Sequence, residues 1–165
     1  MSAAVLSLGS NLGDRLGHLQ FAVAGFGAAV RAVSPVYETA PWGVTDQDDF
    51  LNAVLLVEDP ATDEWGWLRR GQELENAAGR VRTLRWGPRT LDVDVVTVDG
   101  VRSDHPDLLL PHPGTPERAT VLAPWLDVEP AAILPGHGPV AALLSALSMD
   151  GVRRRDDLTL TLPPA

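Results

Sequence analysis

Two residue types are missing from this 165-residue sequence, which contains neither cysteine nor lysine. The absence of cysteine excludes disulfides and thiolate metal ligands. Without lysine the chain cannot supply a P-loop lysine, and neither a GxxxxGKS/T nor a GxGxxG motif occurs. No apolar run approaches the roughly 18 residues that cross a bilayer, and the N-terminus lacks the basic start of a signal peptide. These absences favour a cytoplasmic enzyme or binding domain.

The charge is acidic overall but unevenly distributed. Formal net charge is −9 at pH 7, and all 13 basic residues are arginine. An acidic protein has no general attraction for nucleic acid or an anionic membrane surface. Positive charge is nevertheless concentrated in one segment, where Arg80, Arg82, Arg85 and Arg89 follow one another closely. A basic segment on an acidic background indicates an anionic small ligand.

Hydrophobic periodicity predicts strands and helices within a single domain over residues 1–165. The expected strands are 3–8, 30–37 with an interruption at Pro35, 50–58 and 91–98. The expected helices are about 13–25, a helix opened by Pro60 and Thr62 that ends near Ala78, a piece after 118, and 140–147. Asp99-Gly100 fits a hairpin turn, and the RRRDD segment at 153–157 is expected to be a solvated surface turn. Because no strict β-α repeat occurs, an α+β sheet with helices on its faces is favoured over a doubly wound fold.

Two aspartates stand out in the strongest predicted strand. Residues two apart on a strand point to the same face about 6.5–7 Å apart, so Asp92 and Asp94 share one face. That face is expected to continue with Val96 and Val98, whereas a strand exposed to water should stay polar along its length. We therefore expect the two carboxylates to lie where a covered face opens into a cleft.

Paired carboxylates repel each other unless a cation joins them. Mg²⁺ suits this position because it takes oxygen ligands and is often held by one or two carboxylates plus substrate phosphates. Two such ions could clamp a polyphosphate on both sides of the bond being broken. The DxD spacing alone favours an exposed edge strand with scattered acids, but the neighbouring arginines favour phosphate chemistry. Trp86, between those arginines, either stacks on a base or anchors the loop.

Four segments resemble the 6-hydroxymethyl-7,8-dihydropterin pyrophosphokinase family of the folate pathway. They are LSLGSNLGDR (6–15), SPVYETAPWGVTDQDDFLNAVLLVE (34–58), ELENAAGRVRTLRWGPRTLDVDVV (73–96) and LLLPHPGTPERATVLAPWLDVEP (108–130). The resemblance implies transfer of pyrophosphate from Mg²⁺-bound ATP to the hydroxymethyl group of the pterin, with release of AMP. It also implies a three-layer α/β/α fold with a mainly antiparallel, ferredoxin-like sheet.

The resemblance also implies roles for particular residues. Asp92 and Asp94 are expected to hold two Mg²⁺ ions, and Arg80 and Arg89 to act catalytically on the phosphates. The expected nucleotide-binding residues are Gln72, Glu75, Arg82, Arg85, Trp86, His112 and Arg118. His112 is expected to donate a hydrogen bond to phosphate rather than to bind the metal. The expected pterin-binding residues are Thr39, Ala40, Trp42, Phe50, Asn52 and Thr120. An asparagine and backbone groups can read the polar edge of a pterin, and an aromatic ring can stack on its face.

Three positions depart from the family pattern. Thr120 stands where an aromatic residue usually completes the pterin sandwich, and Trp42 is a candidate to restore the lost contact. Pro113 follows His112 in place of an aromatic residue. A catalytically impaired pterin- or nucleotide-binding module therefore stays open as an alternative, as does, more remotely, a magnesium nuclease. The expected protein is a monomer with ATP and the pterin as its only partners, and its general base is either a carboxylate or a metal-bound hydroxide.

Overall fold

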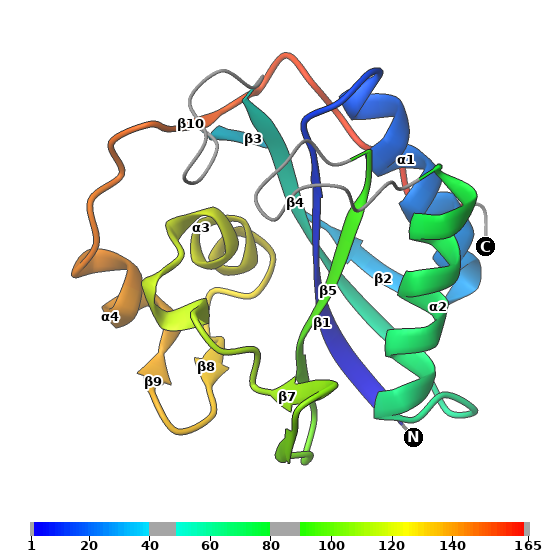
Figure 1. The fold of residues 1–165 in the computed structure, drawn as a ribbon. Coiled ribbons are helices and arrows are strands. Elements are labelled where there is room, and N and C mark those ends of the chain that lie inside the picture. Colours follow the sequence, from blue (N-terminus) through cyan, green and yellow to red (C-terminus); the bar gives the residue numbers. More distant parts are fainter. Residues whose placement is uncertain (1, 40–48, 80–89, 164–165) are drawn as a thin grey trace.

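The computed structural model describes residues 2–39, 49–79 and 90–163 of the chain (Figure 1). Within these ranges a six-stranded sheet has the order β10-β3-β4-β1-β5, and β2 also pairs with β4. Its strands are β1 (Ser2–Ser10), β2 (Val30–Val33), β3 (Tyr37–Thr39), β4 (Phe50–Asp59), β5 (Asp92–Val98) and β10 (Val152–Arg154). All of the pairings are antiparallel. The predicted antiparallel α+β class is confirmed.

The connections between these strands explain their order. Helix α1 (Arg15–Phe26) follows β1, and helix α2 (Glu64–Ala77) joins β4 to β5. Helix α1 carries the chain back to β2 and β3, which both pair antiparallel with β4, and helix α2 carries it back from β4 to β5. As a result β4 and β5 both run antiparallel to the central strand β1. The resulting β-α-β-β-α-β path is that of a ferredoxin-like core.

Two hydrophobic cores lie on opposite faces of the sheet. The larger joins α1 and α2 to the sheet and includes Leu6, Leu8 and Trp67, each fully buried. The smaller joins Val5, Val54 and Val96 to helix α3 (Ala119–Val128) and helix α4 (Val140–Ser145). Figure 1 shows α1 and α2 on one side of the strands and α3 on the other. The three-layer arrangement that the resemblance implies is therefore present.

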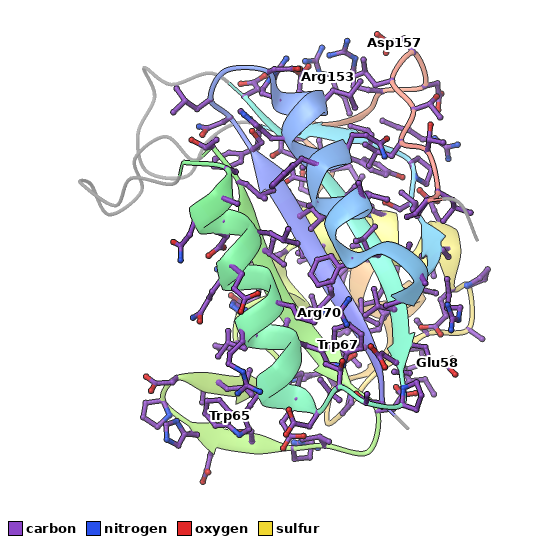
Figure 2. The ribbon with its side chains drawn as sticks, turned by 90° about the vertical axis from the view of Figure 1, so that its right-hand side faces the viewer. Glu58, Trp65, Trp67, Arg70, Arg153 and Asp157 are labelled. Carbon is purple, nitrogen blue, oxygen red and sulfur yellow. The ribbon has the colours of Figure 1, made fainter. Side chains whose placement is uncertain are left out.

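Helices α1 and α2 lie side by side over the sheet (Figure 2). Arg70 of α2 lies 5.0 Å from the ring centroid of Trp67 and 5.5 Å from that of Phe26, which ends α1. The same guanidinium pairs with Asp59 at 3.1 Å. An arginine between two aromatic rings with a carboxylate partner keeps its charge solvated while its stem covers the apolar contact. This cluster fixes the end of the molecule where β4 passes into α2.

The predicted start of helix α2 is wrong. Pro60 and Thr62 do not open helix α2, because β4 continues to Asp59 and residues 60–62 form a turn. The helix begins at Glu64, and the side chain of Asp63 caps it by accepting a hydrogen bond of 2.7 Å from the backbone N–H of Gly66. A carboxylate at this position satisfies one of the free N–H groups of the first turn. The capping residue, rather than the proline, therefore sets the start.

The predicted strand over 30–37 is divided into β2 and β3. Proline has no N–H group for a ladder hydrogen bond, and Pro35 lies in the gap between the two strands. Ser34 still holds the chain beside β4, since its N–H donates to the Val54 carbonyl at 2.9 Å and its hydroxyl accepts from the Val54 N–H at 2.8 Å. The interruption predicted at Pro35 is confirmed.

The second half of the chain adds short elements around the sheet. They are the hairpin β6 (Ser103–His105) and β7 (Leu108–Leu110), the 3₁₀ turn at Thr115–Glu117, α3, the pair β8 (Ile133–Leu134) and β9 (Gly138–Pro139), and α4. The Asp99-Gly100 turn is confirmed, although pairing after it stops at a single bridge between Val98 and Val101. None of the helices in the described ranges is long and apolar enough to cross a membrane.

The RRRDD segment is only in part the solvated turn that the sequence indicated, because residues 156–157 form an exposed turn but Arg153 and Arg154 belong to a strand. Residues Val152–Arg154 form β10, which pairs with β3 so that Arg153 lies opposite Glu38. The charge pattern did not indicate this strand, because Arg153 stays largely exposed while it also pairs with Glu38 of the neighbouring strand. After β10 the chain crosses to the α1 side (Figure 1), where Leu160 is 8% exposed in the larger core.

Candidate active site

The two aspartates lie at the start of β5, the outer strand of the sheet. Both are half-buried; Asp92 lies opposite Gly9 and Asp94 opposite Ser7 of β1. The same face continues with Val96, which is buried beneath α3. The change along this face from half-buried acids to a buried valine is the pattern that the sequence predicted. Val98 is an exception, because a β-bulge between Val95 and Thr97 shifts the alternation and turns Val98 toward the opposite core.

Glu75 holds the backbone between the two aspartates. It lies on α2 with only 3% of its surface exposed, and its Oε2 accepts a hydrogen bond of 2.8 Å from the Val93 N–H. Because β5 is the outer strand, this N–H has no strand partner on that side. A buried carboxylate that accepts from the backbone fixes that peptide in place. Glu75 therefore orients the strand segment that carries Asp92 and Asp94.

A glycine separates the acids from the predicted pterin residues. Gly9 lies opposite Asp92 on one side and opposite Asn52 of β4 on the other. A Cβ atom at Gly9 would lie 3.4 Å from Asn52 Oδ1 and 3.6 Å from Phe50 Cδ1. Neighbouring strands are about 4.8 Å apart, so Asp92 and Asn52 lie about 10 Å apart across this row. The missing side chain lets Asn52 and Phe50 lie close to the backbone of β1.

Three predicted pterin residues, Asn52 of this row and the neighbouring pair Thr39 and Phe50, come together on the same face of the sheet. Asn52 Nδ2 donates a hydrogen bond of 2.9 Å to Thr39 Oγ1, and Thr39 lies opposite Phe50 in the β3–β4 pair. Because Thr39 holds one amide hydrogen, the Asn52 side chain has a fixed orientation and keeps its carbonyl oxygen available as an acceptor. Asn52 and Phe50 are both half-buried. The arrangement places the Asn52 amide, which can hydrogen-bond to the polar edge of a flat ring, next to the aromatic ring of Phe50.

Tyr37 connects this part of the sheet to the helix above it. Its hydroxyl donates to Asp127 Oδ2 of α3 at 2.5 Å. Burial, together with the hydrogen bond to Asp127, raises the pKa of Tyr37 to about 12, so the phenol stays protonated as a donor. Thr120, in the first turn of α3, is half-buried and lies seven residues before Asp127, which places both on the same side of the helix.

His112 lies beside the second aspartate. Its N–H donates to the Val96 carbonyl at 2.8 Å, and its side chain lines a cleft of about 200 Å³ together with Asp94, Leu68 and Leu109. The ring Nδ1 lies 2.8 Å from the Pro113 carbonyl oxygen. A carbonyl only accepts, so Nδ1 carries a hydrogen, and the ring donates through Nε2 only when it is protonated. The predicted donation to phosphate therefore requires an imidazolium.

Arg118 and Gln72 have different surroundings. Gly114 adopts a φ of 85°, and a Cβ atom there would lie 3.3 Å from Arg118 Nε, so the half-buried guanidinium folds back over the turn after His112. Gln72 is exposed on α2, one turn before Glu75. The predicted residues Ala40, Trp42, Arg80, Arg82, Arg85, Trp86 and Arg89 lie outside the described residues.

The described acids fit a magnesium site. Asp92 and Asp94 are half-buried on one face of β5, and Gly9 lies opposite Asp92 on the neighbouring strand. In the described part of the chain, no three histidine, aspartate or glutamate side chains gather closely enough to form an all-protein metal cage. Mg²⁺ keeps several water ligands and needs only one or two carboxylates, so this donor set suits it.

Comparison with known proteins identifies the family. Residues 5–130 match the model of the 7,8-dihydro-6-hydroxymethylpterin-pyrophosphokinase (HPPK) family. The chain belongs to the HPPK family. The match includes every predicted site residue, from Thr39 to Thr120.

Relatives of this HPPK family chain align over most of its length. The chain is 48% identical over 159 residues to the 2-amino-4-hydroxy-6-hydroxymethyldihydropteridine pyrophosphokinase of Mycobacterium tuberculosis, covering 89% of this chain and 85% of that one. A protein of the same name from Methylorubrum extorquens is 41% identical and covers 93% of this chain and 99% of its own. A Plasmodium falciparum HPPK-DHPS crystal structure has a TM-score of 0.68 at 13% identity, which shows the shared fold. It matches 88% of this HPPK chain, which spans only 45% of that longer chain.

The site also contains residues that sequence reasoning missed. Gly9 and Ser7 lie opposite the two aspartates, yet their types suggest no chemistry. The sequence signal for Gly9 was its place in the Gly9-Ser10 pair directly after the first predicted strand. Only the pairing of β1 with β5 shows that Gly9 lies opposite Asp92. Tyr37 and Asp127, whose hydrogen bond joins the sheet to α3, were likewise not predicted.

Proposed function

We propose that this chain transfers pyrophosphate from ATP to the hydroxymethyl group of 6-hydroxymethyl-7,8-dihydropterin, with release of AMP. The observation that carries this proposal is the row Asp92–Gly9–Asn52 across three strands. It sets a pair of acids suited to Mg²⁺ about 10 Å from an oriented amide beside an aromatic ring. Folate biosynthesis is the process that the family name and the relatives support.

Asp92 and Asp94 are the residues that would hold Mg²⁺, and we propose two ions. When bound, these ions would neutralise the phosphate oxygens and hold ATP in line with its acceptor. The protein contributes by presenting both carboxylates in a fixed position, since Glu75 restrains the Val93 peptide between them. A preorganised pair needs no rearrangement as charge develops on the phosphates.

The nucleotide is assigned to the Asp94 side of the site. The cleft there combines the carboxylate of Asp94 with the apolar side chains of Leu68 and Leu109 and the ring of His112. An imidazolium at His112 would donate to a phosphate through Nε2. Arg118, whose side chain lies against Gly114 in the adjoining turn, would add positive charge on this side of the site. Apolar walls next to cationic donors suit a nucleoside with its phosphates.

The pterin is assigned to the Asn52 side. The Asn52 amide, fixed by Thr39, would accept from the amino edge of the ring, and Phe50 would stack on its face. The absence of a side chain at Gly9, which lies opposite both Asn52 and Asp92, would let the hydroxymethyl group approach the acids. Ala40, Trp42 and Thr120 complete the proposed pterin set, and Arg80, Arg89, Arg82, Arg85, Trp86, Gln72 and Glu75 complete the proposed phosphate and nucleotide set.

An assay of AMP formation tests the proposal. Wild-type protein with ATP, Mg²⁺ and the hydroxymethyl dihydropterin should form AMP, and omission of Mg²⁺ or of the pterin should abolish it. Asp92→Asn should lower kcat by about 10²-fold or more, because removal of one charge stabiliser in a preorganised site typically costs that much. Asp99→Asn, in the turn at the far end of β5, is the matched control and should leave the rate unchanged.

One observation favours a second candidate, a binding module without turnover. Thr120 occupies a position where the family has an aromatic ring, which weakens stacking by about 1 kcal/mol. Tight binding of ATP and pterin without AMP would support that module and contradict the enzyme. Phosphodiester cleavage without pterin would instead indicate a hydrolase.

We further propose that residues 1–165 act as one cytoplasmic, monomeric domain. The relative from Methylorubrum extorquens supports the domain assignment, because it aligns over 99% of its own length. Sedimentation equilibrium tests the monomer directly, since a mass of 17.6 kDa is expected for a single chain.

A further inference from the structure

Glu38 of β3 lies at the centre of a cluster of arginines. Its Oε2 accepts from Arg15 at 2.8 Å, and its Oε1 accepts from both Arg153 and Arg155. Only 7% of Glu38 is exposed. Burial alone raises the pKa of Glu38, but hydrogen bonds and charges from Arg15 and Arg155 outweigh it and hold that pKa below its usual value. Glu38 is therefore ionised and fully engaged at neutral pH.

The cluster lies directly behind the proposed pterin residues. Side chains alternate along a strand, so Glu38 points to the α1 face while Tyr37 and Thr39 point to the opposite face. On that opposite face Thr39 accepts the hydrogen bond from Asn52, and Tyr37 donates to Asp127. The short strand β3 is thus fixed on the α1 face through the ion pairs of Glu38, and on the opposite face its Thr39 orients the Asn52 amide. Movement of β3 would change the orientation of the Asn52 amide.

The arginines of the cluster also reach the start of β4. Arg15 Nη1 donates to the Asp49 carbonyl at 2.8 Å as well as to Glu38. Arg153 Nη2 lies 3.8 Å from Asp49 Oδ2. Asp49 immediately precedes Phe50, so the same two arginines link the end of β3 to the first residue of β4. Thr39 and Phe50, which lie opposite each other, are therefore held in register from the back of the sheet.

Arg153 comes from the C-terminal segment, which is anchored independently. The Arg155 N–H donates to the Val36 carbonyl at 2.8 Å, and Gln20 of α1 exchanges two hydrogen bonds with the backbone of Thr161. Leu160 is buried between these contacts. Arg153 lies at the end of the molecule opposite to Trp65 (Figure 2), beside the start of α1. This segment lies beyond residues 5–130, which the family model matches.

We propose that Arg153, acting through Glu38, is a positioning residue for pterin binding. The inference rests on the proposed function and adds a residue from outside the matched family region to it. Arg153 touches neither substrate; it holds β3 so that Thr39 orients Asn52. The loss of Arg153 should therefore weaken pterin binding and leave ATP binding unchanged, because ATP is assigned to the other side of the row.

Equilibrium titrations of the pterin and of Mg²⁺-ATP test this proposal. Arg153→Ala should raise the pterin Kd about three- to tenfold, which corresponds to about 0.7–1.4 kcal/mol. The Kd of Mg²⁺-ATP should stay the same. Arg153→Lys should restore most of the pterin affinity, because an ammonium on a long stem can still reach Glu38. Arg31→Ala on β2 is the matched control, since its guanidinium contacts only the Ala28 carbonyl among the bonds described.

A double variant tests the route through Glu38. In a Glu38→Gln background the Arg153→Ala change should have little further effect on pterin Kd, because its partner is already changed. Equal weakening of both ligands, or a lower Tm with both Kd values intact, would show a general structural role and overturn the inference. A wild-type protein that binds no pterin would overturn the proposed function and the inference together. A wild-type protein that binds pterin with an unchanged Arg153→Ala Kd would overturn the inference alone.

Discussion

Replacement of Gly71 by alanine tests how helix α2 supports the two aspartates. A Cβ atom at position 71 would lie 2.9 Å from Val93 Cγ1 and 3.2 Å from Val93 Cβ. Val93 is β-branched and buried between Asp92 and Asp94, so its side chain has little freedom to move away. The helix or the strand must shift instead, and Glu75, one turn farther along α2, would shift with it.

The expected magnitude follows from two opposing terms. Alanine in place of glycine inside a helix stabilises it by about 1 kcal/mol. Overpacking of a dense core costs about 1–3 kcal/mol. The steric term is expected to win, giving a net destabilisation of about 1 kcal/mol and a Tm lower by roughly 2–4 °C for a chain of this size. The rate of AMP formation should fall further than stability, because the shift moves both carboxylates.

Urea unfolding followed by far-UV circular dichroism measures the first effect, and the AMP assay measures the second. Val93→Ala supplies the control, because it removes the methyl group that the new Cβ meets. The double variant Gly71→Ala/Val93→Ala should be more stable than the sum of the two single effects by about 1 kcal/mol. A Gly71→Ala protein more stable than wild type, with full activity, would refute the packing of α2 on β5 as described.

Three other predictions follow. Asn52→Ala should raise the pterin KM about tenfold with an unchanged ATP KM, since one oriented polar contact is worth roughly 1–1.5 kcal/mol; equal changes in both KM values would contradict its assignment. Glu75→Ala should lower the free energy of unfolding by about 1.5–3 kcal/mol, because the Val93 N–H loses a charged partner. Chemical denaturation measures this change, and a loss of less than about 0.5 kcal/mol would contradict the prediction. The lowered pKa of Glu38 stabilises the fold above its unfolded pKa of about 4.3, and this contribution disappears as pH falls through the folded pKa. In thermal melts the Tm difference between wild type and Glu38→Gln should therefore shrink below about pH 4. A Tm difference that stays constant down to about pH 2 would show that the ionisation of Glu38 does not contribute to stability.

Much of the sheet was predictable because its strands are local apolar runs. The segments 50–58 and 91–98 are continuous enough in valine and leucine to predict buried strands, and both occur as β4 and β5. The β-bulge in β5 was not predictable, because an extra residue depends on how β1 pairs with it. As a result Val96 was placed on the correct face and Val98 on the wrong one.

The site was predictable in residue type and only partly in geometry. The DxD pair indicated a metal site once the arginines and the family resemblance were considered together. The positions of Gly9 and Glu75 required tertiary structure, since one acts through the absence of a side chain and the other through a backbone hydrogen bond from another element. The predicted loop arginines lie outside the described residues, and their roles stay predictions.

The C-terminal strand shows why charge alone misleads. Three successive arginines are typical of a solvated surface, and that reasoning predicted a turn at 153–157, which is right for the exposed turn at 156–157 and wrong for the strand residues 153–154. The decisive partner, Glu38, lies 115 positions earlier in the chain, and a single sequence does not indicate such a distant pairing. Arg153 pairs with the buried carboxylate of Glu38, and residues 152–154 join the sheet beside β3.

Transfer of both terminal phosphates of ATP in one step is the central claim, and isotopic labelling tests it most directly. Separate reactions with β-labelled and γ-labelled ATP, Mg²⁺ and the hydroxymethyl dihydropterin would be resolved by chromatography. The account predicts that both labels appear on the pterin in equal amounts, with unlabelled AMP formed in a one-to-one ratio. Label on the pterin from γ-labelled ATP alone, with ADP as the second product, would contradict it.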